Sequence, residues 1–196
     1  RILARPGCRA GENGAVRSLR GQLLVAGPGL LDPNFRRTVV LLAEHGEDGA
    51  MGVVLNRVSG VAVEDAVPPI AELVGAGALV HLGGPVQPQA VVVLADFVEP
   101  HRAGALVLDT IGFLPGDVDD ADDLGRLRRV RVFAGYAGWG PGQLEEELAE
   151  QSWVVLPARG SDVFSDAPDG LWSDVLRRHG GGLAVLALLP DDPHVN

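Results

Sequence analysis

The fold of this chain is decided by residues Gly21–Arg57, which read GQLLVAGPGLLDPNFRRTVVLLAEHGEDGAMGVVLNR. Two apolar runs have the length of a strand, Thr38–Leu42 and Met51–Leu55. Between them the chain reverses at the segment 46–52, which contains three glycines. Such runs separated by a turn predict an antiparallel β-hairpin. Because Thr38–Leu42 shows no alternation of polar and apolar residues, we expect this strand to be buried on both faces. The turn before it is Asp32-Pro33-Asn34, since Pro sets φ and Asx side chains bind nearby backbone.

The rest of the chain predicts further short strands and a few helices. Val63–Val74 is a short helical region interrupted by Pro68-Pro69, and Leu171–Leu176 shows one apolar helical face that ends at Gly180. The segment 117–123 carries five Asp and leads into Leu124–Arg131, which carries four Arg. Acids before bases match the helix dipole and predict a helix over Leu124–Arg131. Strands are expected at Gln22–Ala26, Leu79–Leu82, Ala90–Leu94, Ala105–Leu108, Val130–Gly135 and Trp153–Leu156.

Two C-terminal elements have specific signals. Gly140-Pro141 predicts the start of a helix, with Pro at the first helical position. Leu183–Leu189 is an apolar run whose length favours a last strand, with a short helix as the alternative. Hairpins dominate and strands do not alternate with helices in βαβ order, so the fold class is α+β with a mainly antiparallel sheet. A chain of 196 residues suits one domain, expected over residues 19–196. Residues 1–18 are expected to be a disordered or non-native extension.

Composition excludes several kinds of chemistry. All sixteen basic residues are Arg, and the chain has no Lys, so a Walker A loop, a pyridoxal phosphate enzyme and a Schiff-base aldolase are excluded. One cysteine, Cys8, cannot form an internal disulfide, which fits a reducing cytoplasm. No cysteine pair, H-E-x-x-H or complete G-x-G-x-x-G motif is present, so we expect no metal and no cofactor. No apolar run is long enough to cross a membrane, and we expect no membrane partner.

The charge of the chain disfavours nucleic acid as a partner. The net charge is −10, whereas nucleic-acid binding requires Lys and Arg to neutralise phosphates. The first twenty residues and the Arg126–Arg131 group are the local exceptions. Sequence-specific binding is therefore not expected.

Polar side chains gather at the borders of the predicted hairpin strands. We expect Asp32, Asn34, Arg37 and Asn56 to lie in one hydrogen-bonded cluster, with Arg57 beside it. An Arg fork binds a carboxylate or a phosphate, so this cluster is a candidate ligand site. Internal Arg–Asp pairing that only stabilises the fold uses the same groups and remains the alternative.

Two further motifs are candidates. Glu44-His45, at the end of a strand, could supply acid–base chemistry or could hold the hairpin turn. Trp139, between glycines, could seal the end of the sheet or could present an aromatic platform to a ligand. Gln143 near a helix start could bind an anion beside backbone N–H groups.

Four blocks in order resemble the AlgH/YqgE family of small bacterial proteins. They are Asp32–Thr38, Glu44–Arg57, Gly83–Val86 and Phe133–Glu145. The ending, 190–196, resembles the actinobacterial branch. The resemblance implies a curled, barrel-like sheet with helices packed outside. It implies no established biochemical activity, and the family name reflects a proposed role in transcriptional control.

Three functions follow as expectations. The first is a cytoplasmic protein that acts by binding an unknown protein or small molecule, in a regulatory role. The alternatives are an enzyme or small-ligand sensor with a polar cleft at Asp32, Arg37 and His45, and a weak nucleic-acid partner. These functions need a protein-facing patch, a concave polar pocket and a basic face, respectively. The candidate residues for a ligand or partner are Asp32, Asn34, Arg37, Glu44, His45, Asn56, Arg57, Trp139 and Gln143.

Overall fold

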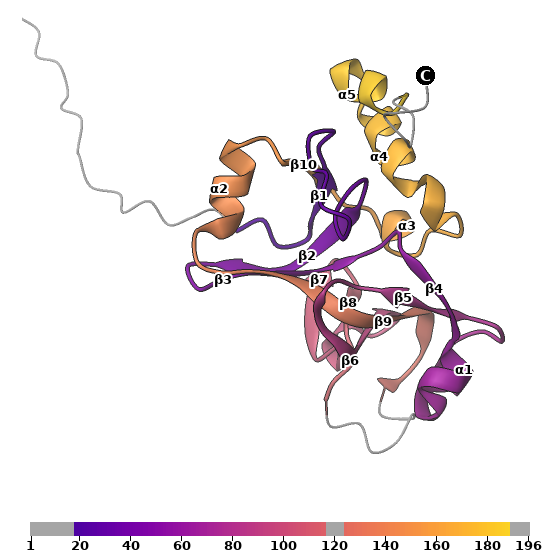
Figure 1. Ribbon diagram of the computed structural model, residues 1–196. Helices are drawn as coiled ribbons and strands as arrows, with labels where there is room; N and C mark the ends of the chain where they lie inside the picture. Colours follow the sequence, from indigo (N-terminus) through magenta and orange to yellow (C-terminus); the bar gives the residue numbers. More distant parts are fainter. Residues whose placement is uncertain (1–17, 117–123, 189–196) are drawn as a thin grey trace, which may run out of the picture.

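The predicted hairpin lies at the centre of the computed structural model, which describes residues 18–116 and 124–188. Strand β2 (Val39–Gly46) pairs antiparallel with β3 (Gly49–Val54), and a bulge falls between Leu42 and Glu44. On the other side of β2 lies β1 (Gln22–Ala26), which in turn pairs with β10 (Trp153–Pro157). These four strands form one half of the sheet (Figure 1).

A long strand, β9 (Leu127–Trp139), joins this half to the second half. Its last residues pair with β3, where Trp139 lies opposite Ala50, and its first part pairs with β6 (Val86–Phe97). Strand β5 (Leu79–Leu82) pairs parallel with β9 and antiparallel with β4 (Val58–Ala62). Strands β8 (Ile111–Phe113) and β7 (Ala105–Leu108) continue beyond β6.

The sheet confirms the expected class. Within the described ranges, every strand pair except β5–β9 is antiparallel, and helices pack outside the sheet, so the fold is α+β. The path through the described strands runs β10-β1-β2-β3-β9-β6-β8-β7 and has two separate ends. The sheet is therefore curled but not closed.

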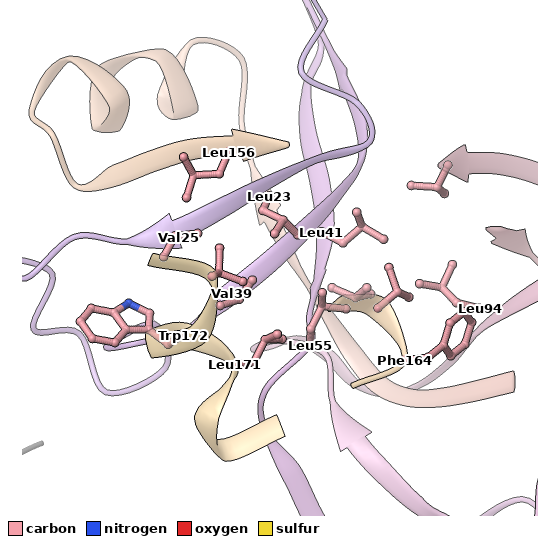
Figure 2. Packing of buried hydrophobic residues seen from close by; sticks show 14 of the residues in the cluster. Leu23, Val25, Val39, Leu41, Leu55, Leu94, Leu156, Phe164, Leu171 and Trp172 are labelled. Carbon is pink, nitrogen blue, oxygen red and sulfur yellow. The ribbon is translucent and has the colours of Figure 1, made fainter. Parts of the chain in front are cut away.

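Strands β1 to β3 are buried on both faces, as their continuous apolar runs predict. Leu41 and Val53 point into one core cluster, whereas Val40 and Val54 point into another on the opposite face. Figure 2 shows the first cluster, where Leu171 and Trp172 from a C-terminal helix lie beside residues of β1 and β2. Side chains that alternate along a strand face opposite sides, so each strand contributes to two cores.

Helices cover the outside of the sheet. The longest, α4 (Leu171–His179), buries its four predicted apolar residues and ends at Gly180, whose φ of 71° is in the left-handed region. In Figure 1, α3, α4 and α5 lie together on one side, α2 lies beside the end of β3, and α1 lies at the opposite end. No helix in the described ranges has both the length and the apolar character needed to cross a membrane. The remaining helical segments are α1 (Val63–Ala66), α2 (Gln143–Ala149), α3 (Gly160–Val163), α5 (Gly181–Leu186) and the 3-10 turns η1 (Pro68–Leu73), η2 (Pro100–Arg102) and η4 (Pro168–Gly170).

Two predictions about elements are wrong, and a third is decided in favour of its alternative. The segment from Leu127 is the start of strand β9 and not a helix, because β6 offers it a continuous antiparallel partner. The apolar run from Leu183 was favoured as a strand, but its alternative, a short helix, is confirmed: it forms part of α5, which packs against α4 and the core. Helix α2 begins at Gln143, after Gly142 with φ 76°, so Pro141 precedes the helix. The acidic segment 117–123 and residues 1–17, including Cys8, lie outside the described residues.

Candidate functional site

A buried asparagine holds the loop between β1 and β2 against the end of β3. The Asn56 Oδ1 accepts the N–H of Val39 at 2.8 Å, and its Nδ2 donates to the carbonyl of Arg37 at 2.9 Å. Beside it, Nη2 of Arg57 donates to the carbonyl of Arg36 at 2.6 Å. Arg37 has a φ of 54°, a region that non-glycine residues rarely adopt. These hydrogen bonds therefore maintain a strained backbone that turns two successive arginines toward one hollow.

That hollow is the arginine pocket, about 460 Å³ in volume. The guanidinium of Arg37 lies 4.2 Å from the ring centroid of Trp172, on the first turn of α4. The indole N–H of Trp172 donates to the carbonyl of Ala26 at 2.9 Å, which ties α4 to β1. The volume lies within the range of about 300–1,000 Å³ typical of small-molecule sites. The pocket is lined by Pro33, Arg36, Arg37, Asn56, Arg57, Asp169, Trp172 and Ser173.

The arginine pocket carries a net positive charge inside an acidic chain. It contains three arginines and one acid, Asp169. Among the residues that the structure describes, no ion pair joins Arg36 or Arg57 to a carboxylate. Other arginines do pair with acids: Arg102 with Glu99, Arg128 with Asp96, Arg129 with Asp166, Arg177 with Asp174 and Arg178 with Asp162. The guanidinium groups of Arg36 and Arg57, which line the pocket without a carboxylate partner among the described residues, suit a carboxylate or phosphate ligand.

Asp32 and Asn34 lie on the same loop but form a separate unit. Oδ1 of Asp32 accepts the backbone N–H of Asn34 at 2.8 Å, an Asx turn, and both residues are exposed. Neither lines the arginine pocket. The single cluster expected from the sequence is thus two pairs: Asp32 with Asn34, and Arg37 with Asn56.

His45 joins three segments of the fold. Its side chain is only 2% exposed, and Nε2 lies 2.9 Å from Oε1 of Glu145 on α2. Nδ1 accepts the N–H of Leu19 at 3.1 Å, so the proton of the neutral ring is on Nε2. The side chain of Glu44 is exposed, and no hydrogen bond or ion pair joins it to another described residue. The partner of His45 is thus Glu145, and both ring nitrogens are occupied.

Trp139 seals the end of the sheet. It is 6% exposed, and its ring stacks on Phe35 at 6.2 Å and meets Trp153 edge-on at 5.9 Å. Both indole N–H groups donate to Oε2 of Glu147, at 2.9 and 2.7 Å. Gln143 donates to the other carboxylate oxygen at 2.9 Å and accepts the N–H of Gly140 at 3.0 Å. Trp139 is therefore a core residue, and the Gln143 amide is occupied within the protein.

The guanidinium groups of the arginines at the start of β9 also form hydrogen bonds within the protein. Arg129 donates to the carbonyl of Phe164, and Arg131 donates to the carbonyls of Val163 and Ser165. Burial lowers the pKa of Arg131 to about 10, so the guanidinium stays charged at neutral pH. These contacts fix the chain after α3 to the sheet.

His81 is a buried histidine near these arginines. Burial, together with the charge of Arg131, lowers the pKa of His81 to about 4. Its Nδ1 lies 3.3 Å from the carbonyl of Leu79, while Nε2 is buried and has no hydrogen-bond partner among the described residues. The ring is therefore neutral at physiological pH.

Within residues 18–116 and 124–188, no group of three His, Cys, Asp or Glu residues could hold a metal ion. The pocket residues that sequence reasoning missed are Asp169, in the 3-10 turn η4, and Ser173, in the first turn of α4. Trp172 was expected on the inner face of that helix, but its contact with Arg37 carried no sequence signal.

Comparison with known proteins identifies the family. The AlgH-like family (DUF179) matches residues 23–184. A UPF0301 protein of Streptomyces coelicolor is 46% identical over 189 residues, which cover 92% of this chain and 97% of that protein. The crystal structure of a protein from Corynebacterium diphtheriae is similar, with a TM-score of 0.78, 30% identity and coverage of 92% of this chain and 95% of that chain. The solution structure of AlgH from Pseudomonas aeruginosa gives a TM-score of 0.65 at 29% identity, over 93% of this chain and 100% of that chain. This chain therefore belongs to the AlgH-like family.

Proposed function

We propose that the protein acts in the cytoplasm by binding, in a regulatory role, and that a small anionic molecule is its ligand in the arginine pocket. One observation carries the proposal: Arg36 and Arg57 line a pocket without a carboxylate partner among the described residues, in a chain with 26 acidic residues. The regulatory part rests on the role proposed for the family.

The surroundings of the pocket support an anion. The first turn of α4 forms part of one wall, and no side chain in the described part of the chain caps the N-terminus of this helix. Backbone N–H groups and the helix dipole at such a position favour negative charge. The hydrogen bonds of Asn56 hold the arginine loop in place before a ligand arrives, which reduces the entropy cost of binding.

The alternatives have weaker support. An enzyme that uses His45 as an acid–base group would need one free ring nitrogen, but both contact Leu19 and Glu145. A nucleic-acid face at Arg126–Arg131 would need guanidinium groups directed to solvent. The side chains of Arg128 and Arg129 are 47% and 53% exposed, but their guanidinium groups and that of Arg131 already donate to carbonyls of the protein. We therefore propose neither catalysis at His45 nor sequence-specific nucleic-acid binding.

The test is calorimetric titration of the full chain with inorganic phosphate at low salt. We expect saturable binding that weakens as salt rises, because ions screen charge pairs. Arg36→Gln and Arg57→Gln should each weaken binding about tenfold or more, since a charged hydrogen bond contributes about 1.5–3 kcal/mol. Arg126→Gln makes the same charge change at an exposed position outside the pocket and should leave the affinity unchanged. Absence of phosphate binding, or an equal loss in all three variants, would refute the proposal.

A further inference from the structure

The arginine pocket contains opposite charges that do not pair with one another. Asp169 lines the same hollow as Arg36 and Arg57, yet no ion pair or hydrogen bond joins its side chain to any residue in the described ranges. The neighbouring acids do pair: Asp162 with Arg178, and Asp174 with Arg177. The pocket thus offers guanidinium groups and a carboxylate at separate places, and both can be reached by one ligand.

These groups require different partners. Guanidinium groups only donate hydrogen bonds and bind an anion, whereas the Asp169 carboxylate only accepts and binds a donor. A ligand with an anionic group alone would leave Asp169 without a partner and would bring a second negative charge close to it. A ligand that also carries a donor satisfies both parts of the lining.

The backbone around Asp169 indicates which donor fits. Ser173 follows Asp169 by four residues, and Gly170 between them has helical φ and ψ of −83° and −13°, so η4 runs directly into α4. Residues at this spacing are neighbours on one side of a helix, and both line the pocket. An ammonium group has three donors and can serve the carboxylate and the hydroxyl together, whereas a ligand hydroxyl has one. Its hydrogen bond to a carboxylate is also about twice as strong as a neutral one.

From these observations we infer that the ligand of the arginine pocket carries an ammonium group besides its anionic group, and is a small amino acid or aminoalkyl phosphate. The anionic group contacts Arg36 and Arg57, and the ammonium group contacts Asp169 and Ser173. The guanidinium of Arg37, which lies on Trp172, has no part in this assignment. The inference rests on the proposed anion site and adds a second, cationic group to the ligand.

The experiment compares probes that differ only in the ammonium group, at three chain lengths: glycine with acetate, β-alanine with propionate, and 4-aminobutyrate with butyrate. A second set, 2-aminoethyl phosphate with ethyl phosphate, repeats the comparison with a phosphate. Heteronuclear NMR titration of the full chain suits weak ligands, and the indole N–H of Trp172 in the pocket lining reports occupancy. In at least one pair the amino compound should bind about three- to tenfold more tightly, as for a charged hydrogen bond at a partly exposed site.

The variant Asp169→Asn should abolish this preference through opposite changes in the two probes. The amino compound should bind more weakly, whereas the compound without an ammonium group should bind as tightly as before or more tightly, because a negative charge has been removed. Damage to the fold would weaken both. The control is Asp174→Asn, which removes an exposed carboxylate in the first turn of α4 but outside the pocket lining, and it should retain the preference.

Two outcomes would overturn the inference while anion binding itself still stood. One is equal binding within every pair by the wild type, and the other is an unchanged preference in Asp169→Asn. Failure of inorganic phosphate and of every probe to bind would overturn the inference and the proposed function together.

Discussion

Replacement of Trp139 by alanine tests how the end of the sheet is sealed. The indole is 6% exposed, packs between Phe35 and Trp153, and donates to Glu147. Truncation of a buried Trp costs about 3–5 kcal/mol, because apolar contacts are lost and a cavity remains. Glu147 keeps its hydrogen bonds from Trp153 and Gln143, so the carboxylate is not left unpartnered. We therefore expect a loss near the middle of this range, about 4 kcal/mol.

Denaturant unfolding measures this loss. The midpoint should fall while the slope stays unchanged, as for a variant with the same fold and lower stability. For a chain of this size, about 4 kcal/mol lowers the melting temperature by about 8–16 °C. Because α2 is fixed to the sheet through Glu147, its amides should also lose protection from hydrogen exchange more than those of α4.

Trp139→Phe serves as the matched variant. It keeps an aromatic ring beside Phe35 and Trp153 but removes the indole N–H that donates to Glu147. We expect it to lose about 1.5–3 kcal/mol, the contribution of one hydrogen bond to a charged group. An unchanged midpoint in Trp139→Ala would refute the role as a seal. Equal losses in the two variants would assign the effect to the hydrogen bond and not to the buried ring.

Three further predictions concern buried polar groups. Asn56→Ala leaves the buried N–H of Val39 and the carbonyl of Arg37 without partners and should cost about 2–5 kcal/mol in chemical unfolding, with Asn34→Ala on the exposed loop near zero. Asp162→Asn breaks the two-point pair with Arg178 and should cost about 3–5 kcal/mol, whereas Asp174→Asn at an exposed pair should cost under about 1 kcal/mol. His81 has a pKa of about 4 in the folded protein against an ordinary value of 6.5, so the unfolded chain binds the proton first as pH falls. The free energy of unfolding should therefore drop by about 3 kcal/mol between pH 6.5 and 4, relative to His81→Gln. Parallel pH curves for the two proteins would contradict the burial of a neutral ring.

Local sequence patterns were sufficient to predict the elements whose conformation follows from burial of their apolar residues. The apolar runs around Val40 and Val53 predicted the central hairpin, because a strand with two buried faces can carry no polar alternation. The face of α4 and its end at Gly180 followed from helical spacing and from the left-handed conformation that glycine adopts. The start of β9 was missed because its arginines matched a helix dipole. Only the neighbouring β6 and the carbonyls after α3 show why an extended chain is favoured there.

The candidate site was predictable only in part. Arg37, Asn56 and Arg57 were identified from their positions beside strand ends, and they do meet at the arginine pocket. Glu44 was paired with His45 because the two are adjacent in sequence. The structure gives His45 a partner 100 residues away, in Glu145.

What the sequence by itself determined is the family, the class of fold, the buried hairpin and the exclusion of lysine chemistry. All of these depend on residue types and short spacings. What only the tertiary structure decided is which polar groups are occupied within the protein and which face a pocket. Hydrogen-bond partners are chosen by proximity in space: Asp169 and Ser173 reach the arginine loop because α4 packs on β1 through Trp172. No local pattern in residues 33–57 encodes that contact, because it arises when distant segments bury a common core.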